Sequence, residues 1–220
     1  MERTLKVTGK GNVKIKPDLT IIQLSFTGVG KEYAETLEKS VGDVAEIKDM
    51  LIQLGFNKNE LKTTYFNVNS EYESYKDEKG NYCSKFVGYR YNQTLKFSFD
   101  IDNKILGKVL FALSRVKTHP KFDIIYSVKN VEEAKNLLLK DAVKDANNKA
   151  DIIAKASNVE LGSILNIDYS FINIEFSSRM INSDCAMLYN KCSSVGSYDI
   201  DIEPDDIEAS DSITLIYAIS

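Results

Sequence analysis

The stretch NVEEAKNLLLKDAVKDANNKADIIAKASN, from Asn130 to Asn158, decides the fold that the sequence predicts. Apolar residues recur in it at steps of three or four, the spacing of one face of an α-helix. These residues are Val131, Ala134, Leu138, Ala142, Ala146, Ala150 and Ile153. Asn130 is suited to cap the first turn, and Glu133 stands where a capping-box carboxylate would be. Because the middle of the stripe is alanine, we expect a long helix lying very close to a sheet, with a far end suited to docking on another subunit.

Alternating apolar residues predict strands on both sides of this helix. Thr4–Lys16 and Leu19–Thr27 flank the turn at Pro17-Asp18, and we expect them to form a hairpin. Gly9 and Gly11 lie on the apolar face of the first strand, which indicates a bulge or a close approach of two backbones. Further strands are expected at 61–75, 84–99, 121–128, 161–171 and 207–219.

Two more helices complete the predicted fold. The first covers 31–54, with an apolar stripe formed by Leu37, Val41, Val44, Ile47, Leu51 and Leu54. A shorter one, capped by Asp102 or Asn103, extends to Arg115. The order β-β-α-β-β-α-β-α-β-β predicts an α+β fold with mainly antiparallel sheet. We expect one domain over 1–220, with a two-lobed organisation, 1–99 and 100–220, as the alternative.

Composition excludes several classes of protein. The 220 residues carry a net charge of −4, and Lys and Arg are spread along the chain, so no nucleic-acid partner is expected. No apolar run approaches the ~20 residues of a membrane-spanning helix. The N-terminus is polar and has no apolar signal region, which predicts a cytoplasmic protein, or a periplasmic or secreted one if a leader has been removed.

The segment 177–199 is predicted to be the least structured part of the chain, because it is rich in Ser, Asn and Asp. It holds two of the three cysteines, Cys185 and Cys192, and the third is Cys83. If exposed and low in pKa, Cys185 and Cys192 would make a thiol redox sensor. The alternative is that all three are ordinary free thiols.

No group of residues predicts a catalytic, metal or cofactor site. His119 is the only histidine and has no nucleophile beside it in sequence. Gly28 and Gly30 lack the third glycine and the Lys-Ser/Thr of a phosphate-binding loop. The acidic run 199–208 lacks the glycine of a calcium-binding loop and is expected to be solvated. The chain is therefore expected to be no enzyme and to hold no cofactor.

Tyrosines concentrate in the predicted strands 61–75 and 84–99. The residues are Tyr65, Tyr72, Tyr75, Tyr89 and Tyr91, with Tyr82 near the turn. Packing across the two strands would account for them. The alternative is an interaction surface, since tyrosine is enriched at protein interfaces.

Several short motifs together resemble the SIMPL-domain family, over nearly the whole chain. They are the opening strand with Gly9-Lys10-Gly11, Val13 and Pro17-Asp18; Leu54-Gly55-Phe56 followed by Leu61-Lys62-Thr63 and the aromatic strand from Tyr65 to Tyr72; Tyr89-Arg90-Tyr91; the alanine-spaced helix running into Leu161-Gly162; and Ile202-Glu203-Pro204-Asp205-Asp206-Ile207 with the last strand. The resemblance implies a protein of unknown precise role. Members of that family include periplasmic immunogenic proteins, some linked to oxidative stress, a large ring-like oligomer, and a kinase-binding protein.

Three hypotheses for function follow. The first is a non-enzymatic protein that acts through homo-oligomeric assembly or binding of a protein partner, with a role in stress tolerance. The second is a small-ligand-binding protein or enzyme with a pocket between the helices and the sheet. The third is a cytosolic thiol sensor that uses Cys185 and Cys192.

Overall fold

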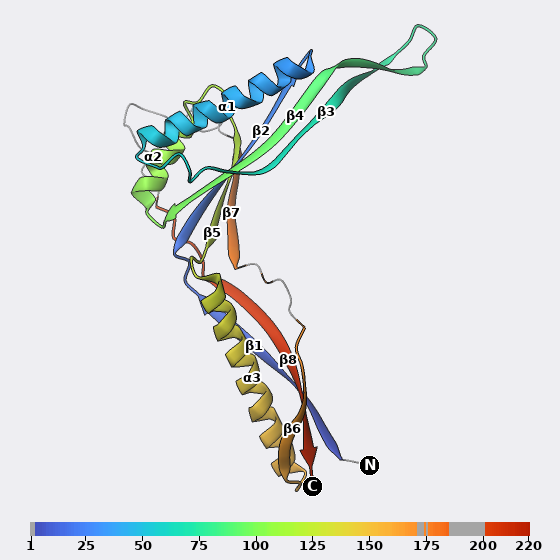
Figure 1. Cartoon of the computed structure of the whole chain (residues 1–220), viewed down its shortest axis with the longest axis vertical. Coiled ribbons are helices and arrows are strands. Elements are labelled where there is room, and N and C mark those ends of the chain that lie inside the picture. Colours follow the sequence, from blue (N-terminus) through green and yellow to red (C-terminus); the bar gives the residue numbers. More distant parts are fainter. Residues whose placement is uncertain (1–2, 171–173, 175, 185–200) are drawn as a thin grey trace. The chain divides into compact units, whose positions relative to one another are not determined.

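The computed structural model describes residues 3–170, 174, 176–184 and 201–220. Over these residues the chain forms three helices and eight strands, and the strands make two sheets with antiparallel pairing (Figure 1). The predicted α+β class and element order are confirmed. The chain divides into two compact units, one made of Met1–Asp18, Ser127–Ser178 and Pro204–Ser220, and one made of Leu19–Tyr126 and Arg179–Glu203.

The first unit is a three-stranded sheet with one helix on it. The strand order is β1-β8-β6, with β1 at Thr4–Ile15, β8 at Ile207–Ile219 and β6 at Leu161–Asp168. The helix α3, Val131–Ala156, is the predicted long helix. The Asn130 side chain accepts a hydrogen bond from the Glu133 N–H (3.0 Å) and donates one to the Glu133 carboxylate (3.0 Å). The predicted capping pair is present, with the carboxylate bound to the Asn130 amide group.

Glycines on β1 allow α3 to lie against the strand almost backbone to backbone. A Cβ added at Gly9 would lie 2.1 Å from the carbonyl oxygen of Ala142, and one added at Gly11 would lie 2.2 Å from that of Leu138. Ala142 and Ala146 are fully buried against this strand. The close approach predicted from the glycines and from the alanine stripe is therefore confirmed.

Side chains of α3 also hydrogen-bond to the outer edge of β1. They are spaced by four residues, so they lie in one row along the helix. The bonds join Asp141 to the N–H of Asn12 (3.0 Å), Asp145 to the N–H of Lys10 (2.7 Å), and Lys149 to the C=O of Thr8 (3.3 Å). An edge strand whose backbone groups are occupied in this way cannot readily pair with another chain.

The second unit is a five-stranded sheet of order β3-β4-β2-β5-β7 with two helices. The strands are β2 (Leu19–Gly30), β3 (Lys62–Lys76), β4 (Tyr82–Asp100), β5 (Lys121–Ser127) and β7 (Ser177–Asp184). The helices are α1 (Tyr33–Gln53) and α2 (Asn103–Leu113). Asp102 is the cap of α2, and its side chain accepts from the N–H groups of Lys104 and Ile105.

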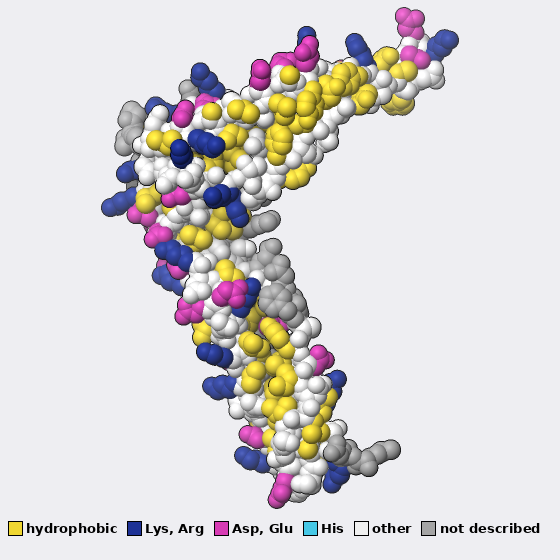
Figure 2. Space-filling view, viewed as in Figure 1, with side chains coloured by type: hydrophobic (Ala, Val, Ile, Leu, Met, Phe, Trp, Pro, Cys, Tyr) yellow, Lys and Arg dark blue, Asp and Glu magenta, His cyan; other side chains and the backbone are white. Residues whose placement is uncertain are grey.

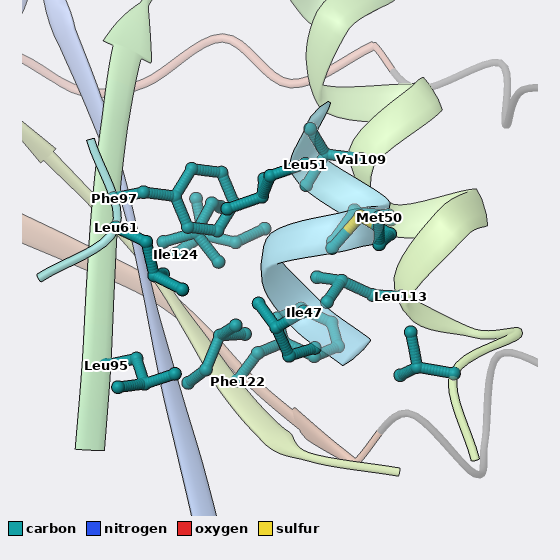
Figure 3. Packing of buried hydrophobic residues seen from close by; sticks show 14 of the residues in the cluster. Ile47, Met50, Leu51, Leu61, Leu95, Phe97, Val109, Leu113, Phe122 and Ile124 are labelled. Atoms are coloured by element: carbon teal, nitrogen blue, oxygen red, sulfur yellow. The ribbon is translucent and has the colours of Figure 1, made fainter. Parts of the chain in front are cut away.

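The core of this unit lies between the sheet and the two helices. Ile47 and Leu51 of α1 meet Val109 of α2 above Phe97 and Ile124 of the sheet (Figure 3). All five side chains are buried to 2% exposure or less. Burying a side chain of this size stabilises the fold by about 1.5–3 kcal/mol.

Three expectations about individual elements need correction. The hairpin of β1 with β2 is wrong, because β1 pairs with β8 and β2 pairs with β4. The segment 177–199 begins with regular structure, the strand β7. Its part from 185 to 199 lies outside the described residues. On α1, only Ile47 and Leu51 of the predicted stripe are fully buried: Val41 is 68% exposed, and Leu37, Val44 and Leu54 are half-buried.

Candidate functional site

The feature that stands out in the second unit is the hairpin of β3 and β4, which extends past the N-terminal end of α1 (Figure 1). The two strands pair from Lys62 to Lys76, with a register shift near each end of the stretch from Tyr65 to Glu71. Alternation along the strands gives the hairpin two different faces. One face turns toward α1 and the core, and the other turns away from them.

The face on the side of α1 carries a row of four aromatic rings. Tyr33 at the start of α1 contacts Tyr89 edge-on (5.4 Å between ring centroids), Tyr89 contacts Phe86 (5.3 Å), and Phe86 contacts Tyr72 (5.6 Å). We call these four residues the aromatic row. Tyr72, Tyr33 and Phe86 are 59%, 51% and 44% exposed. Hydrophobic side chains gather over this hairpin in the space-filling view (Figure 2). The rings are thus ordered by each other while remaining open to a partner.

Tyr91 lies on the same face but belongs to the core. It is 2% exposed, and its hydroxyl donates a hydrogen bond to the Asp43 carboxylate of α1. Burial, reinforced by this bond, raises the pKa of Tyr91 above its ordinary value of 10.0. Gly28, opposite Tyr91 in the register, leaves room for the ring, because a Cβ there would lie 2.4 Å from it. Gly28 therefore has a packing role.

The opposite face of the hairpin is polar. Arg90 donates two hydrogen bonds to the Glu71 carboxylate (2.8 and 2.6 Å), and these hold the pKa of Glu71 below its ordinary value. Tyr65 and Tyr75 point to this side, by their alternation with Phe66 and Tyr72. The five tyrosines predicted as one interaction surface are therefore divided between two faces: Tyr72, Tyr89 and Tyr91 on one, Tyr65 and Tyr75 on the other.

An open groove of about 620 Å³ lies between α1 and the β3 side of the sheet. We call it the α1–β3 groove. Its lining residues are Leu37, Ser40, Val41, Val44, Ala45, Lys48, Thr63, Phe66 and Gln93. Gln93 is 8% exposed, lies opposite Phe66 in the register, and its Oε1 has no hydrogen-bond partner in the described part of the chain. Lys48 is the one charged residue among those lining the groove.

The other residues considered from the sequence do not come together in one site. His119 is exposed, and its backbone φ is 42°. It lines an open depression together with Tyr65 and Lys121. Cys83 is a free thiol. Cys185 and Cys192 lie outside the described residues, so the thiol sensor stays a prediction. Among residues 3–170, 174, 176–184 and 201–220, no cluster of His, Cys, Asp and Glu is suited to a metal ion.

Sequence reasoning missed three members of these surfaces: Tyr33, Phe86 and Gln93. Phe86 could have been found, because it falls in line with Tyr72 once a bulge at Val87 is allowed for. Tyr33 lies at the start of a helix, and no local pattern indicates that it would meet Tyr89. A lone Gln in an alternating strand gives no sign that its carbonyl will lack a partner.

The fold and the hairpin define an α+β protein whose most distinctive surface is an exposed aromatic strand pair. A model of the SIMPL family, described as a protein of unknown function (DUF541), matches residues 5–217. The chain therefore belongs to the SIMPL family, and the resemblance stated from its motifs is confirmed. It is also similar to the 26 kDa periplasmic immunogenic protein of Brucella melitensis biotype 1, with 26% identity over 165 residues. That match covers 74% of this chain and 65% of the relative, so it spans slightly less than two thirds of the relative's length.

The relative corrects one expectation. A cytoplasmic location was predicted from the polar N-terminus, and it conflicts with a related protein that is described as periplasmic. Polarity at the start of the printed sequence is a weak guide to location, because it says nothing of segments beyond that sequence. None of the described helices is long and apolar enough to cross a membrane.

Proposed function

We propose that this SIMPL protein acts by binding polypeptides through the aromatic row, either other copies of itself in a homo-oligomer or a separate protein partner. The observation that carries the proposal is the exposure of Tyr33, Tyr72 and Phe86 in one ordered row. Half of about 200 Å² for each ring gives roughly 300 Å² of apolar surface. Patches of that size on a protein surface are often functional, and Tyr and Phe are enriched at interfaces.

The proposed role is non-enzymatic, since binding through this row needs no reacting group. We also propose the periplasm as the place where it acts, because the Brucella relative is described as periplasmic. A link to oxidative stress is a prediction from the family resemblance alone, and it concerns the process rather than the mode of action.

The test measures absolute mass by light scattering after gel filtration, over a range of protein concentrations. The wild type should form a discrete multimer, and the double variant Tyr72→Ser with Phe86→Ser should shift it toward the 24.8 kDa of the single chain. The control is Tyr65→Ser with Tyr75→Ser, because these two rings are 52% and 49% exposed on the opposite face of the same hairpin.

Two results would contradict the proposal. One is a wild type that stays a monomer at every concentration and also captures no protein from a periplasmic extract by crosslinking. The other is equal dissociation in the two double variants, because assembly would then not distinguish the aromatic row from the polar face.

A further inference from the structure

The strand β3 is one edge of the five-stranded sheet. In the part of the chain that the structure describes, no side chain hydrogen-bonds to the backbone of β3. The edge of β1 differs, since Asp141, Asp145 and Lys149 of α3 occupy it. An unoccupied edge is a template for one more strand.

One part of β3 is suited to pairing. The residues Tyr65–Ser70 carry no charge and keep a regular register with β4, between the two register shifts. Charged residues stand on both sides of this stretch, with Lys62 before it and Glu71 and Glu73 after it. Charges and bulges protect an edge strand from unwanted pairing. The unprotected length is about 20 Å at roughly 3.3 Å per residue.

The α1–β3 groove lies beside this same stretch. Phe66 belongs both to the edge stretch and to the lining of the groove. A strand added outside β3 would place every second side chain on the face that turns toward α1. Those side chains would enter the groove and contact Leu37, Val41 and Val44, which the core leaves partly or largely uncovered.

One charged group defines the chemistry of the occupant further. Lys48 lines the groove and makes no ion pair within the described residues, so an acidic group on the occupant would complement it.

We propose that Tyr65–Ser70 of β3 and the α1–β3 groove bind an extended peptide segment of a partner protein. The segment adds to the sheet as a strand, places apolar side chains at alternate positions in the groove, and carries one acidic group at Lys48. This inference goes beyond the proposed function, because the groove and the edge stretch share no residue with the aromatic row. A small apolar acid would fill the groove but leave the open backbone of β3 unused.

The probe is a fluorescein-labelled peptide of about eight residues, alternating valine and threonine and ending in one glutamate. Binding to the full chain is measured by fluorescence anisotropy. The control peptide has the same side chains but is N-methylated at alternate residues, so that it cannot donate to β3. We expect saturable binding of the first peptide, and binding at least about tenfold weaker for the second, because every hydrogen bond that the peptide donates to β3 is lost.

Variants of the protein locate the binding. Val41→Lys should weaken the peptide at least about tenfold, because it places a charge in the apolar groove. Ile52→Lys is the matched control on the same helix: Ile52 is 50% exposed, lies outside the groove lining, and should leave binding unchanged. Lys48→Gln should weaken binding by about two- to fivefold, as expected for an exposed ion pair. Circular dichroism confirms that each variant is folded.

Three results would overturn the inference. They are no binding of the unmodified peptide at millimolar concentration, equal binding of the N-methylated peptide, and saturable binding of dodecanoate in the groove with none of the peptide. The last result would assign the groove to small apolar acids. The Tyr72→Ser and Phe86→Ser double variant separates this inference from the proposed function. If that variant lowers the mass while no form of the protein binds the peptide, the peptide site fails and assembly through the aromatic row stands.

Discussion

Replacing Gly9 by alanine should destabilise the first unit strongly, although alanine is ordinarily harmless in a strand. The new Cβ would lie 2.1 Å from the Ala142 oxygen, 2.5 Å from the Ala146 nitrogen and 2.6 Å from the Ala146 Cβ. Two of these three atoms belong to the backbone of α3, so no side-chain rotation can relieve the contact. The helix must move away from β1 by about an ångström or more to restore ordinary contact distances.

The magnitude follows from what such a movement disrupts. Overpacking in a close-packed core costs about 1–3 kcal/mol, and the lower backbone entropy of alanine in the unfolded chain returns about 0.5–1 kcal/mol. Moving α3 also stretches the hydrogen bonds from Asp141 and Asp145 to β1. We therefore expect a net loss of about 2 kcal/mol in the free energy of unfolding. Urea denaturation followed by circular dichroism measures it as a lower midpoint.

The control is Gly42→Ala in the middle of α1, where an added Cβ has no atom within 4 Å. Alanine there should stabilise the protein by about 0.8 kcal/mol, because it favours the helix more than glycine does. The same substitution at the two sites thus has opposite signs. If Gly9→Ala is neutral or stabilising, α3 does not lie against β1 as closely as described.

Three further predictions concern the cap and two ionisable groups. Asn130→Ala should lower the stability by about 1 kcal/mol, measured by thermal unfolding, because the first turn of α3 loses its cap. The hydrogen bond from Lys149, and then that from Lys10, hold the pKa of Asp145 below its ordinary 3.8. Its contribution is therefore present above pH 3.8 and is lost as the pH falls through the folded pKa. Wild type and Asp145→Asn should differ in stability at pH 7, and in urea titrations the difference should shrink as the pH is lowered below 3.8. The pKa of Tyr91 is raised, so the folded chain keeps a proton that the unfolded chain releases above pH 10.0. The free energy of unfolding should therefore fall as the pH rises above 10.0, and it should fall less steeply for Tyr91→Phe. Equal slopes for the two proteins would contradict the burial argument.

The sequence predicts best the elements whose signals are local. For α3, the cap at Asn130, the stripe from Ala134 to Ala150 and the two glycines of β1 all agree with one close-packed arrangement. The turn at Pro17-Asp18 misled the pairing of β1, because a local turn indicates that the chain bends and not which strand it joins. The true partner, β8, begins at Ile207, almost two hundred residues further along the chain.

The apolar periodicity of α1 also did not indicate which of its residues are buried in the core and which line the groove. Leu37, Val41, Val44 and Ile47 fall on one apolar stripe, yet only Ile47 is fully covered by the sheet and α2. A stripe shows that a face is apolar, and the length of the neighbouring elements decides how much of it they cover. The tyrosines show the same limit, since their number is visible in the sequence while their division between two faces depends on the register of β3 with β4.

Three edge strands of the chain show how differently exposed backbone is treated. The α3 side chains close the edge of β1. The strand β6 carries apolar residues that remain exposed, such as Ile164 and Ile167, but two register shifts between Leu161 and Asn166 break its pairing within eight residues. A peptide could match it over only a few residues. The strand β3 alone of these three combines an uncharged, regular stretch with an apolar groove alongside. Leaving such an edge open invites aggregation, and a partner that covers it would remove that hazard while gaining both backbone hydrogen bonds and an apolar contact.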